Sequence, residues 1–112
     1  MVTGVKLDRT FAALGDPARR TLVRMLSSGP ATVKELADPF AMTRPAISKH
    51  LRVLKDAGIV TATTRGRQNW YSLESGALAE ADSWLAEVQN MWADALGSLK
   101  AYVEEVEDVD GA

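Results

Sequence analysis

The side chains best suited to chemistry are cations and hydroxyls in the middle of the chain. Between residues 44 and 73 lie six Lys/Arg and a single acid, Asp56, so this segment carries a net charge of +5. Residues 1–43 carry +2, whereas residues 74–112 carry −9, with one lysine against ten acids. Local charge decides where a polyanion docks, so the net charge of −2 does not argue against nucleic acid. The middle segment is therefore the candidate surface for binding DNA.

Composition excludes most other kinds of site. The chain has no cysteine and one histidine, His50. The lack of cysteine excludes disulfides, thiolate metal sites and thiol catalysis, and a single imidazole offers little for a metal site or a catalytic relay. Hydroxyl nucleophiles are present but have no evident base. We therefore expect a protein that is not an enzyme and has no cofactor or metal.

The length of 112 residues predicts one domain, comprising residues 1–112. No run reaches the roughly 18 apolar residues of a membrane span, and the N-terminal residues lack the apolar core of a signal peptide. These features indicate a cytoplasmic protein that does not contact a membrane.

Helix signals fill the first half of the chain. Apolar spacing predicts a helix over residues 5–14 that ends at Gly15, and Asp16-Pro17 begins a second helix that ends before Ser28. Thr32 caps a short third helix, with Glu35 in the reciprocal position of a capping box. Thr43 caps a fourth helix, residues 44–57, which Gly58 ends. The last three helices, with a short one in the middle, indicate a helix-turn-helix.

The segment of residues 59–73 is predicted to be a β-hairpin. Residues 59–64 are rich in β-branched side chains, residues 68–73 form a second strand-like run, and Gly66 between them suits a tight turn. A hairpin that directly follows a helix-turn-helix is a wing. Its tip carries Arg65 and Arg67.

The last part of the chain is predicted to be one helix, from about residue 75 to 107. Its apolar residues repeat at alternating spacings of three and four, which is typical of a coiled-coil seam. At about 1.5 Å per residue, 30 residues extend about 45 Å, more than so small a domain can cover. The seam therefore needs a partner, and a second copy of the chain is the simplest one.

The helix of residues 44–57 has two distinct faces. Ile47, Leu51 and Leu54 fall on one stripe and are predicted to be buried. The opposite face and its flank are basic and hydroxylated, and comprise Arg44, Pro45, Ser48, Lys49, Arg52 and Lys55. Arg and Lys donate to guanine O6 and N7, Ser donates or accepts, and cations neutralise phosphates. This face is predicted to enter the major groove, because acids are almost absent from it and a basic hairpin follows.

Three stretches resemble the ArsR/SmtB family of bacterial winged-helix repressors. Residues 11–20 (FAALGDPARR) resemble its opening, residues 43–60 (TRPAISKHLRVLKDAGIV) its recognition helix, and residues 65–73 (RGRQNWYSL) its wing. The similarity covers roughly residues 9–103. Ala18 stands where the family usually has Thr, and Arg44 where Gln is common. Because Arg44 is at a base-reading position, the family's operator sequence is not carried over.

The resemblance implies a mainly α fold with a small β-hairpin: a winged helix-turn-helix that forms a homodimer through its first and last helices. Such a dimer represses transcription by binding an inverted repeat of double-stranded DNA, with its recognition helices about 34 Å apart. The candidate DNA contacts, from the resemblance and the outward face together, are Thr43, Arg44, Pro45, Ser48, Lys49, His50, Arg52, Arg65 and Arg67. The candidate dimer interface comprises Leu7, Phe11, Leu85, Val88, Trp92, Ala95, Leu99 and Tyr102.

The family is known for metal sensing, but its usual ligands are missing here. Residues 32–40 contain no cysteine, and residues 75–112 contain no histidine. Asp82, Glu87 and Asp94 are more typical of solubilising charge than of a cation site. We expect no transition-metal effector, and the sequence identifies no other effector.

Several residues admit two interpretations. His50 is either a donor to DNA or a packed, hydrogen-bonded side chain, with equal weight. Arg19 and Arg20 could reach phosphates, although an ion pair within the monomer is favoured. One of Trp70 and Tyr71 is expected to pack on the core, because neighbours in a strand face opposite ways.

Two other functions are alternatives to a DNA-binding repressor. A ligand-responsive regulator of the MarR type would also bind DNA, but those chains are usually longer. A winged-helix module for protein–protein contact would use the acidic last helix, and the outward cations of residues 44–67 argue against it. Steep salt dependence would separate DNA binding from protein binding.

Overall fold

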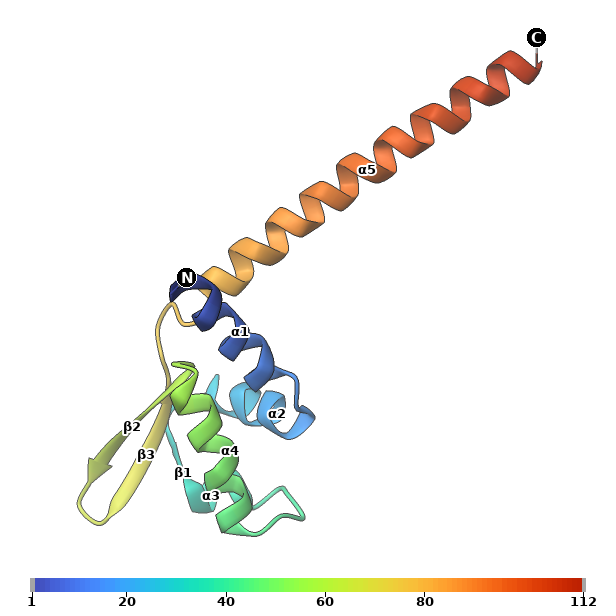
Figure 1. Cartoon of the computed structure of the whole chain (residues 1–112). Coiled ribbons are helices and arrows are strands. Elements are labelled where there is room, and N and C mark those ends of the chain that lie inside the picture. Colours follow the sequence, from blue (N-terminus) through green and yellow to red (C-terminus); the bar gives the residue numbers. More distant parts are fainter. Residues whose placement is uncertain (1, 112) are drawn as a thin grey trace. The chain divides into compact units, whose positions relative to one another are not determined.

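The structure, a computed structural model, describes the backbone of residues 2–111 and the side chains of residues 4–107. It is mainly helical with a small antiparallel sheet, as predicted (Figure 1). The chain divides after Ala81 into two compact units. The elements are α1 (Val2–Leu14), α2 (Pro17–Leu26), β1 (Ala31–Thr32), α3 (Val33–Ala37), α4 (Arg44–Asp56), β2 (Val60–Arg65), β3 (Gln68–Leu73) and α5 (Ala79–Gly111).

The predicted capping residues begin their helices. Asp16 accepts from the N–H groups of Ala18 (2.8 Å) and Arg19 (3.1 Å), which satisfies donors that have no partner within α2. Thr32 accepts from Glu35 N–H (3.3 Å) at the start of α3. The Glu35 carboxylate, however, accepts from the Thr32 hydroxyl (3.1 Å), so the expected reciprocal bond takes a different form.

A glycine turn joins α4 to the wing. Gly58 has φ +77°, donates to the carbonyl of Lys55 (2.9 Å), and is followed by Ile59, which donates to the carbonyl of Leu54 (2.9 Å). These two bonds form a Schellman motif, which needs a residue in the left-handed region that favours glycine. The motif buries Ile59 against Leu54 and directs the chain into β2.

The wing is a two-stranded hairpin with a third short strand beside it. β2 pairs with β3 from Val60↔Leu73 to Arg65↔Gln68, so only Gly66 and Arg67 form the turn. Gly66 has φ +62° and Arg67 does not have a positive φ, which is the pattern of a type II′ turn. β1 pairs with the other edge of β3. The sequence did not predict β1, because a strand of two residues is too short to show an alternation of apolar and polar side chains.

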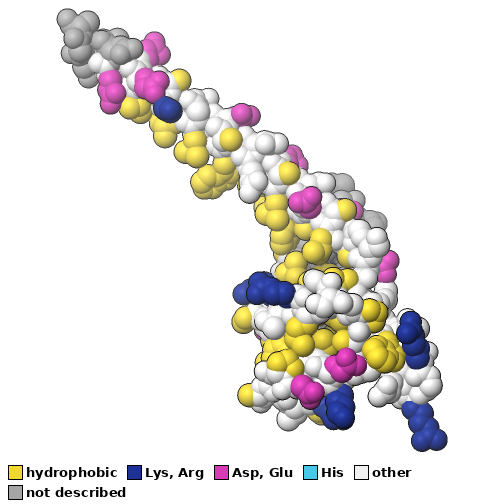
Figure 2. Space-filling model, turned by 180° about the vertical axis from the view of Figure 1, so that it is seen from behind, with side chains coloured by type: hydrophobic (Ala, Val, Ile, Leu, Met, Phe, Trp, Pro, Cys, Tyr) yellow, Lys and Arg dark blue, Asp and Glu magenta, His cyan; other side chains and the backbone are white. Residues whose placement is uncertain are grey.

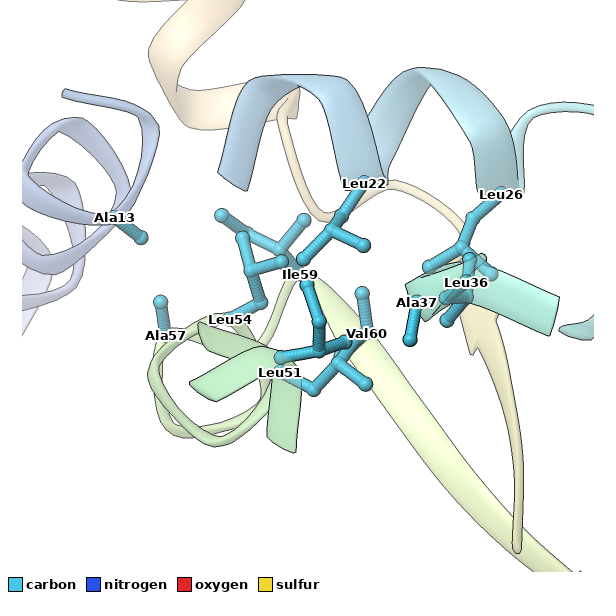
Figure 3. Close-up of a cluster of buried hydrophobic side chains, with 11 residues drawn as sticks. Ala13, Leu22, Leu26, Leu36, Ala37, Leu51, Leu54, Ala57, Ile59 and Val60 are labelled. Atoms are coloured by element: carbon cyan, nitrogen blue, oxygen red, sulfur yellow. The ribbon is translucent and has the colours of Figure 1, made fainter. Parts of the chain in front are cut away.

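The core lies among α2, α3, α4 and the start of the wing (Figure 3). The predicted stripe of Ile47, Leu51 and Leu54 is completely buried. Tyr71 packs against this core, whereas Trp70 belongs to the other face of the strand, so the expectation that one of the two packs inward is confirmed. This packing holds the opposite face of α4 in solvent.

The last helix begins later than predicted. α5 starts at Ala79 rather than at residue 75, because Gly76 has φ +73° and lies in a turn that ends with Ala79 N–H donating to the Gly76 carbonyl (3.1 Å). The helix then continues to Gly111, beyond the predicted end at residue 107. Figure 2 shows apolar side chains along one side of this helix, with acidic side chains scattered elsewhere on it.

Candidate nucleic-acid interface

The N-terminus of α4 is an open, positively polarised helix end. The Thr43 hydroxyl accepts from Ala46 N–H (3.3 Å), and Pro45 occupies the first turn, where no N–H is needed. Both residues are exposed. Because the Thr43 oxygen acts as the acceptor, its O–H proton is available to a phosphate, beside the partial positive charge of the helix end.

The outward face of α4 carries the predicted groove residues. All of these side chains except His50 are exposed, and no acid precedes Asp56 on this helix. The exposed residues of this face are Arg44, Pro45, Ser48, Lys49, Arg52 and Lys55. The buried stripe fixes which way these side chains point. α4 therefore presents a basic, hydroxylated ridge of the size that a major groove admits.

The wing presents its two arginines at the tip of a braced hairpin. Cross-strand bonds join Thr61 to Ser72 (3.1 Å) and Thr64 to Asn69 (2.9 Å). The Arg65 guanidinium carbon lies 6.0 Å from the centre of the Trp70 ring, which is a cation–π distance. Arg65 is thus oriented by a partly buried ring, while Arg67 projects from the turn itself. Sequence analysis missed this contact, which the strand register makes a diagonal pair.

Arg19 and Arg20 hold the end of α1. Arg19 donates to the carbonyls of Ala13 (2.6 Å) and Ala12 (3.1 Å), and Arg20 donates to the carbonyl of Leu14 (2.8 Å). These carbonyls belong to the last turn of α1, where no partner within the helix is available. The favoured expectation of an ion pair was wrong, because the helix end supplies the acceptors.

His50 is partly buried at the edge of the core stripe. Its Nδ1 atom lies 3.4 Å from Nη1 of Arg19. This contact supports the packed, hydrogen-bonded interpretation. The sequence signal for it was the position of His50 beside the buried stripe, but the partner came from a helix 31 residues away.

The carboxylate of Asp16 lies in the same region. Its pKa is below the ordinary value, chiefly because Arg19 N–H donates to it, and the Ala18 N–H and the charges on Arg19 and His50 act in the same direction. Desolvation opposes this shift. Asp16 is therefore a charged capping residue at neutral pH.

The predicted dimer residues lie on α1 and α5. Leu7 and Phe11 are partly buried on α1, and Val88 is partly buried on α5. The others are exposed, and Trp92, Tyr102 and Leu99 have 66%, 65% and 58% of their surface accessible. The exposed members of the predicted seam are Leu85, Trp92, Ala95, Leu99 and Tyr102. These side chains form a long apolar surface, and soluble proteins rarely leave such a surface uncovered.

Neither a metal cluster nor a membrane span occurs in the part of the chain that the structure describes. Within it, no group of three or more His, Asp or Glu side chains could hold a metal ion, and Asp82, Glu87 and Asp94 are exposed on α5. Within the same part, no helix is both long enough and apolar enough to span a bilayer.

Comparison with known proteins identifies the family. Residues 16–62 match the family described as "Bacterial regulatory protein, arsR family". The chain is 38% identical over 89 residues to the HTH-type transcriptional regulator Rv2034 of Mycobacterium tuberculosis, covering 80% of each protein. It is 32% identical over 79 residues to the transcriptional repressor SdpR of Bacillus subtilis, covering 70% of this chain and 88% of SdpR.

A solved structure supports the same assignment. The crystal structure of the ArsR family transcriptional regulator RHA00566 is 40% identical and superimposes with a TM-score of 0.75, covering 80% of this chain and 93% of that one. The fold, the basic recognition helix and these similarities agree. The chain therefore belongs to the arsR family of bacterial regulatory proteins and is a winged helix-turn-helix transcriptional regulator.

Proposed function

We propose that the protein is a homodimeric repressor that binds an inverted-repeat operator in double-stranded DNA. α4 enters the major groove and the wing reaches the adjacent minor groove. The observation that carries this proposal is the basic outward face of α4, held in solvent by a fully buried stripe and followed by two arginines on the wing tip. Because bacterial DNA lies in the cytoplasm, the protein acts there. The proposal includes no catalysis, metal or membrane contact and names no effector.

The proposed contacts divide by what they touch. Arg44, Ser48 and Lys49 face base edges, since they lie on the ridge near the positively polarised end of α4. Thr43, which caps α4, and Pro45 and Arg52 of the same ridge lie against the phosphate backbone. Arg65 and Arg67 enter the minor groove, where the negative potential of narrow A·T-rich segments attracts arginine.

Dimerisation supplies the spacing that a single protomer lacks. A second copy covers the apolar seam of α5. In the other unit, Leu7 and Phe11 of α1 are the proposed contacts to the second copy. A two-fold axis then places two α4 helices about 34 Å apart, one turn of B-DNA. Repression is supported by SdpR, which is described as a transcriptional repressor. Binding of the dimer across a promoter would exclude polymerase.

Selection from random duplex DNA tests the proposal. We expect the full chain to enrich an inverted repeat whose half-sites lie about 10 base pairs apart, with affinity that falls steeply as salt is raised. Lys49→Ala and Arg65→Ala should each weaken binding by about tenfold or more. Lys100→Ala removes the same charge from an exposed position of α5 and should have little effect.

Specific outcomes would refute the proposal. If no duplex is enriched, or if Lys49→Ala and Arg65→Ala bind as tightly as the wild-type chain, α4 and the wing are not the DNA surface. An affinity that is insensitive to salt would instead favour a protein partner.

A further inference from the structure

One arginine joins three helices of the DNA-binding unit. Arg19, in the first turn of α2, donates from Nε to the Ala13 carbonyl (2.6 Å) and from Nη2 to the Ala12 carbonyl (3.1 Å) at the end of α1. Its Nη1 atom lies 3.4 Å from Nδ1 of His50, in the middle of α4. A single planar side chain thus connects the end of a proposed dimerisation helix to the proposed recognition helix.

The direction of the hydrogen bond between Arg19 Nη1 and His50 Nδ1 determines the tautomer of the imidazole. Arginine has five N–H donors and no acceptor, so Nδ1 of His50 must accept. The single ring proton of neutral His50 is therefore on Nε2. A second proton, on Nδ1, would remove the acceptor and place two cations 3.4 Å apart.

Several charged groups surround this contact. Asp16, between α1 and α2, interacts with the charge on Arg19, while its carboxylate oxygen Oδ1 already accepts from two backbone N–H groups. Arg9 of α1 and Asp56 of α4 line the open hollow that Arg19 also borders. Of these charged groups, the guanidinium of Arg19 is the one in hydrogen-bond contact with the ring.

A directional contact adds to what the core of α4 provides. Burial of Ile47, Leu51 and Leu54 fixes which face of the helix turns outward. A bond from the Arg19 guanidinium to position 50 adds a directional restraint on rotation of the helix about its axis. Lys49 and Arg52, one and two residues away on the exposed side, turn with the same helix.

We propose, on the basis of the proposed function, that Arg19 is a positioning residue for DNA recognition. It acts through neutral His50, and the imidazole serves as an acceptor for Arg19 rather than as a contact to DNA. Loss of the acceptor at the place of Nδ1 therefore breaks the contact and weakens DNA binding. A histidine that donated to a phosphate would instead be replaced best by a side chain that donates from the place of Nε2.

Two substitutions of His50 separate these roles. The amide of Asn reaches the place of Nδ1, whereas the amide of Gln reaches the place of Nε2. We measure the affinity of the full chain and of its variants, at pH 7, for the duplex recovered by selection. Loss of the one charge-assisted bond should weaken binding by about tenfold.

The variants should split as follows. His50→Asn should retain wild-type affinity, because its oxygen accepts from Arg19. His50→Gln and Arg19→Lys should bind about tenfold more weakly. Tight binding by His50→Gln with weak binding by His50→Asn, or wild-type affinity in Arg19→Lys, would overturn the proposal. Thermal unfolding of each variant confirms that the protein measured is folded.

A measurement without DNA keeps this inference distinct from the proposed function. Side-chain ¹⁵N shifts of His50 in the free wild-type chain at pH 7 should show the proton on Nε2, and Arg19→Gln should mix the two neutral tautomers. A proton found on Nδ1 would refute the Arg19 contact whether or not the protein binds DNA. Conversely, failure of the wild-type chain to bind any selected duplex would refute the proposed function and leave this reading of the contact intact.

Discussion

Replacing Trp92 on α5 by alanine tests the proposed dimer most directly. Trp92 has 66% of its surface exposed, although it lies within the heptad seam. A tryptophan buries roughly 200 Å² when fully covered, so about 130 Å² of Trp92 is available to a partner. At about 25 cal/mol per Å², covering it contributes about 3 kcal/mol in each protomer.

The two-fold symmetry doubles this effect. A symmetric interface contains Trp92 twice, so complete coverage would contribute about 6 kcal/mol, and coverage of half the area would contribute about 3 kcal/mol. The smaller value raises the dimer dissociation constant by more than about 100-fold. Because Trp92 is exposed in the single protomer, Trp92→Ala should leave the core of residues 2–81 intact.

Sedimentation equilibrium over nanomolar to micromolar concentrations measures this change. We expect a wild-type dimer, a largely dissociated Trp92→Ala variant, and a Lys100→Ala control that matches the wild-type chain. Circular dichroism and thermal unfolding report whether the variant stays folded. A wild-type chain that remains monomeric at micromolar concentration even with a palindromic duplex, or a Trp92→Ala dimer as tight as wild type, would refute the reasoning.

Three further predictions concern the stability of the DNA-binding unit. Leu54→Ala should lower the free energy of unfolding by about 2–5 kcal/mol in urea titrations, because it leaves a cavity in a fully buried site, and a loss below about 1 kcal/mol would contradict the observed packing. Gly58→Ala should cost about 1 kcal/mol by the same assay, because alanine must adopt φ +77°. Gly4→Ala, in the first turn of α1 where φ is not positive, should not destabilise the protein. Asp16 has a lowered pKa, so its contribution to stability is present above its ordinary pKa and is lost as the pH falls through the folded value. Asp16→Asn keeps a capping side chain that does not titrate, so its melting temperature should decline less steeply than that of the wild-type chain below pH 4. An acid profile identical to that of the wild-type chain would contradict this account.

The sequence was sufficient for most local elements of the fold. Asp16, Thr32 and Thr43 begin their helices as predicted, since a cap satisfies backbone donors within three residues of itself. The tight turn at Gly66 was also predicted, because a hairpin turn is specified by its own residues, and the structure shortens it to two residues by pairing Arg65 with Gln68. The start of α5 was misplaced because the heptad pattern begins at Leu78, whereas the turn at Gly76 delays the helix to Ala79.

Part of the candidate site was likewise predictable from the sequence, and part depends on the tertiary structure. The periodicity of residues 44–57 alone determined that Ile47, Leu51 and Leu54 turn inward and that the cations turn outward, because the pitch of a helix is fixed. Only the tertiary structure decided that β1 joins the sheet, that Arg65 lies over Trp70, and that Arg19 meets His50. Each of these contacts joins separate elements, and their distances depend on how whole helices and strands pack. Local sequence patterns do not specify that packing.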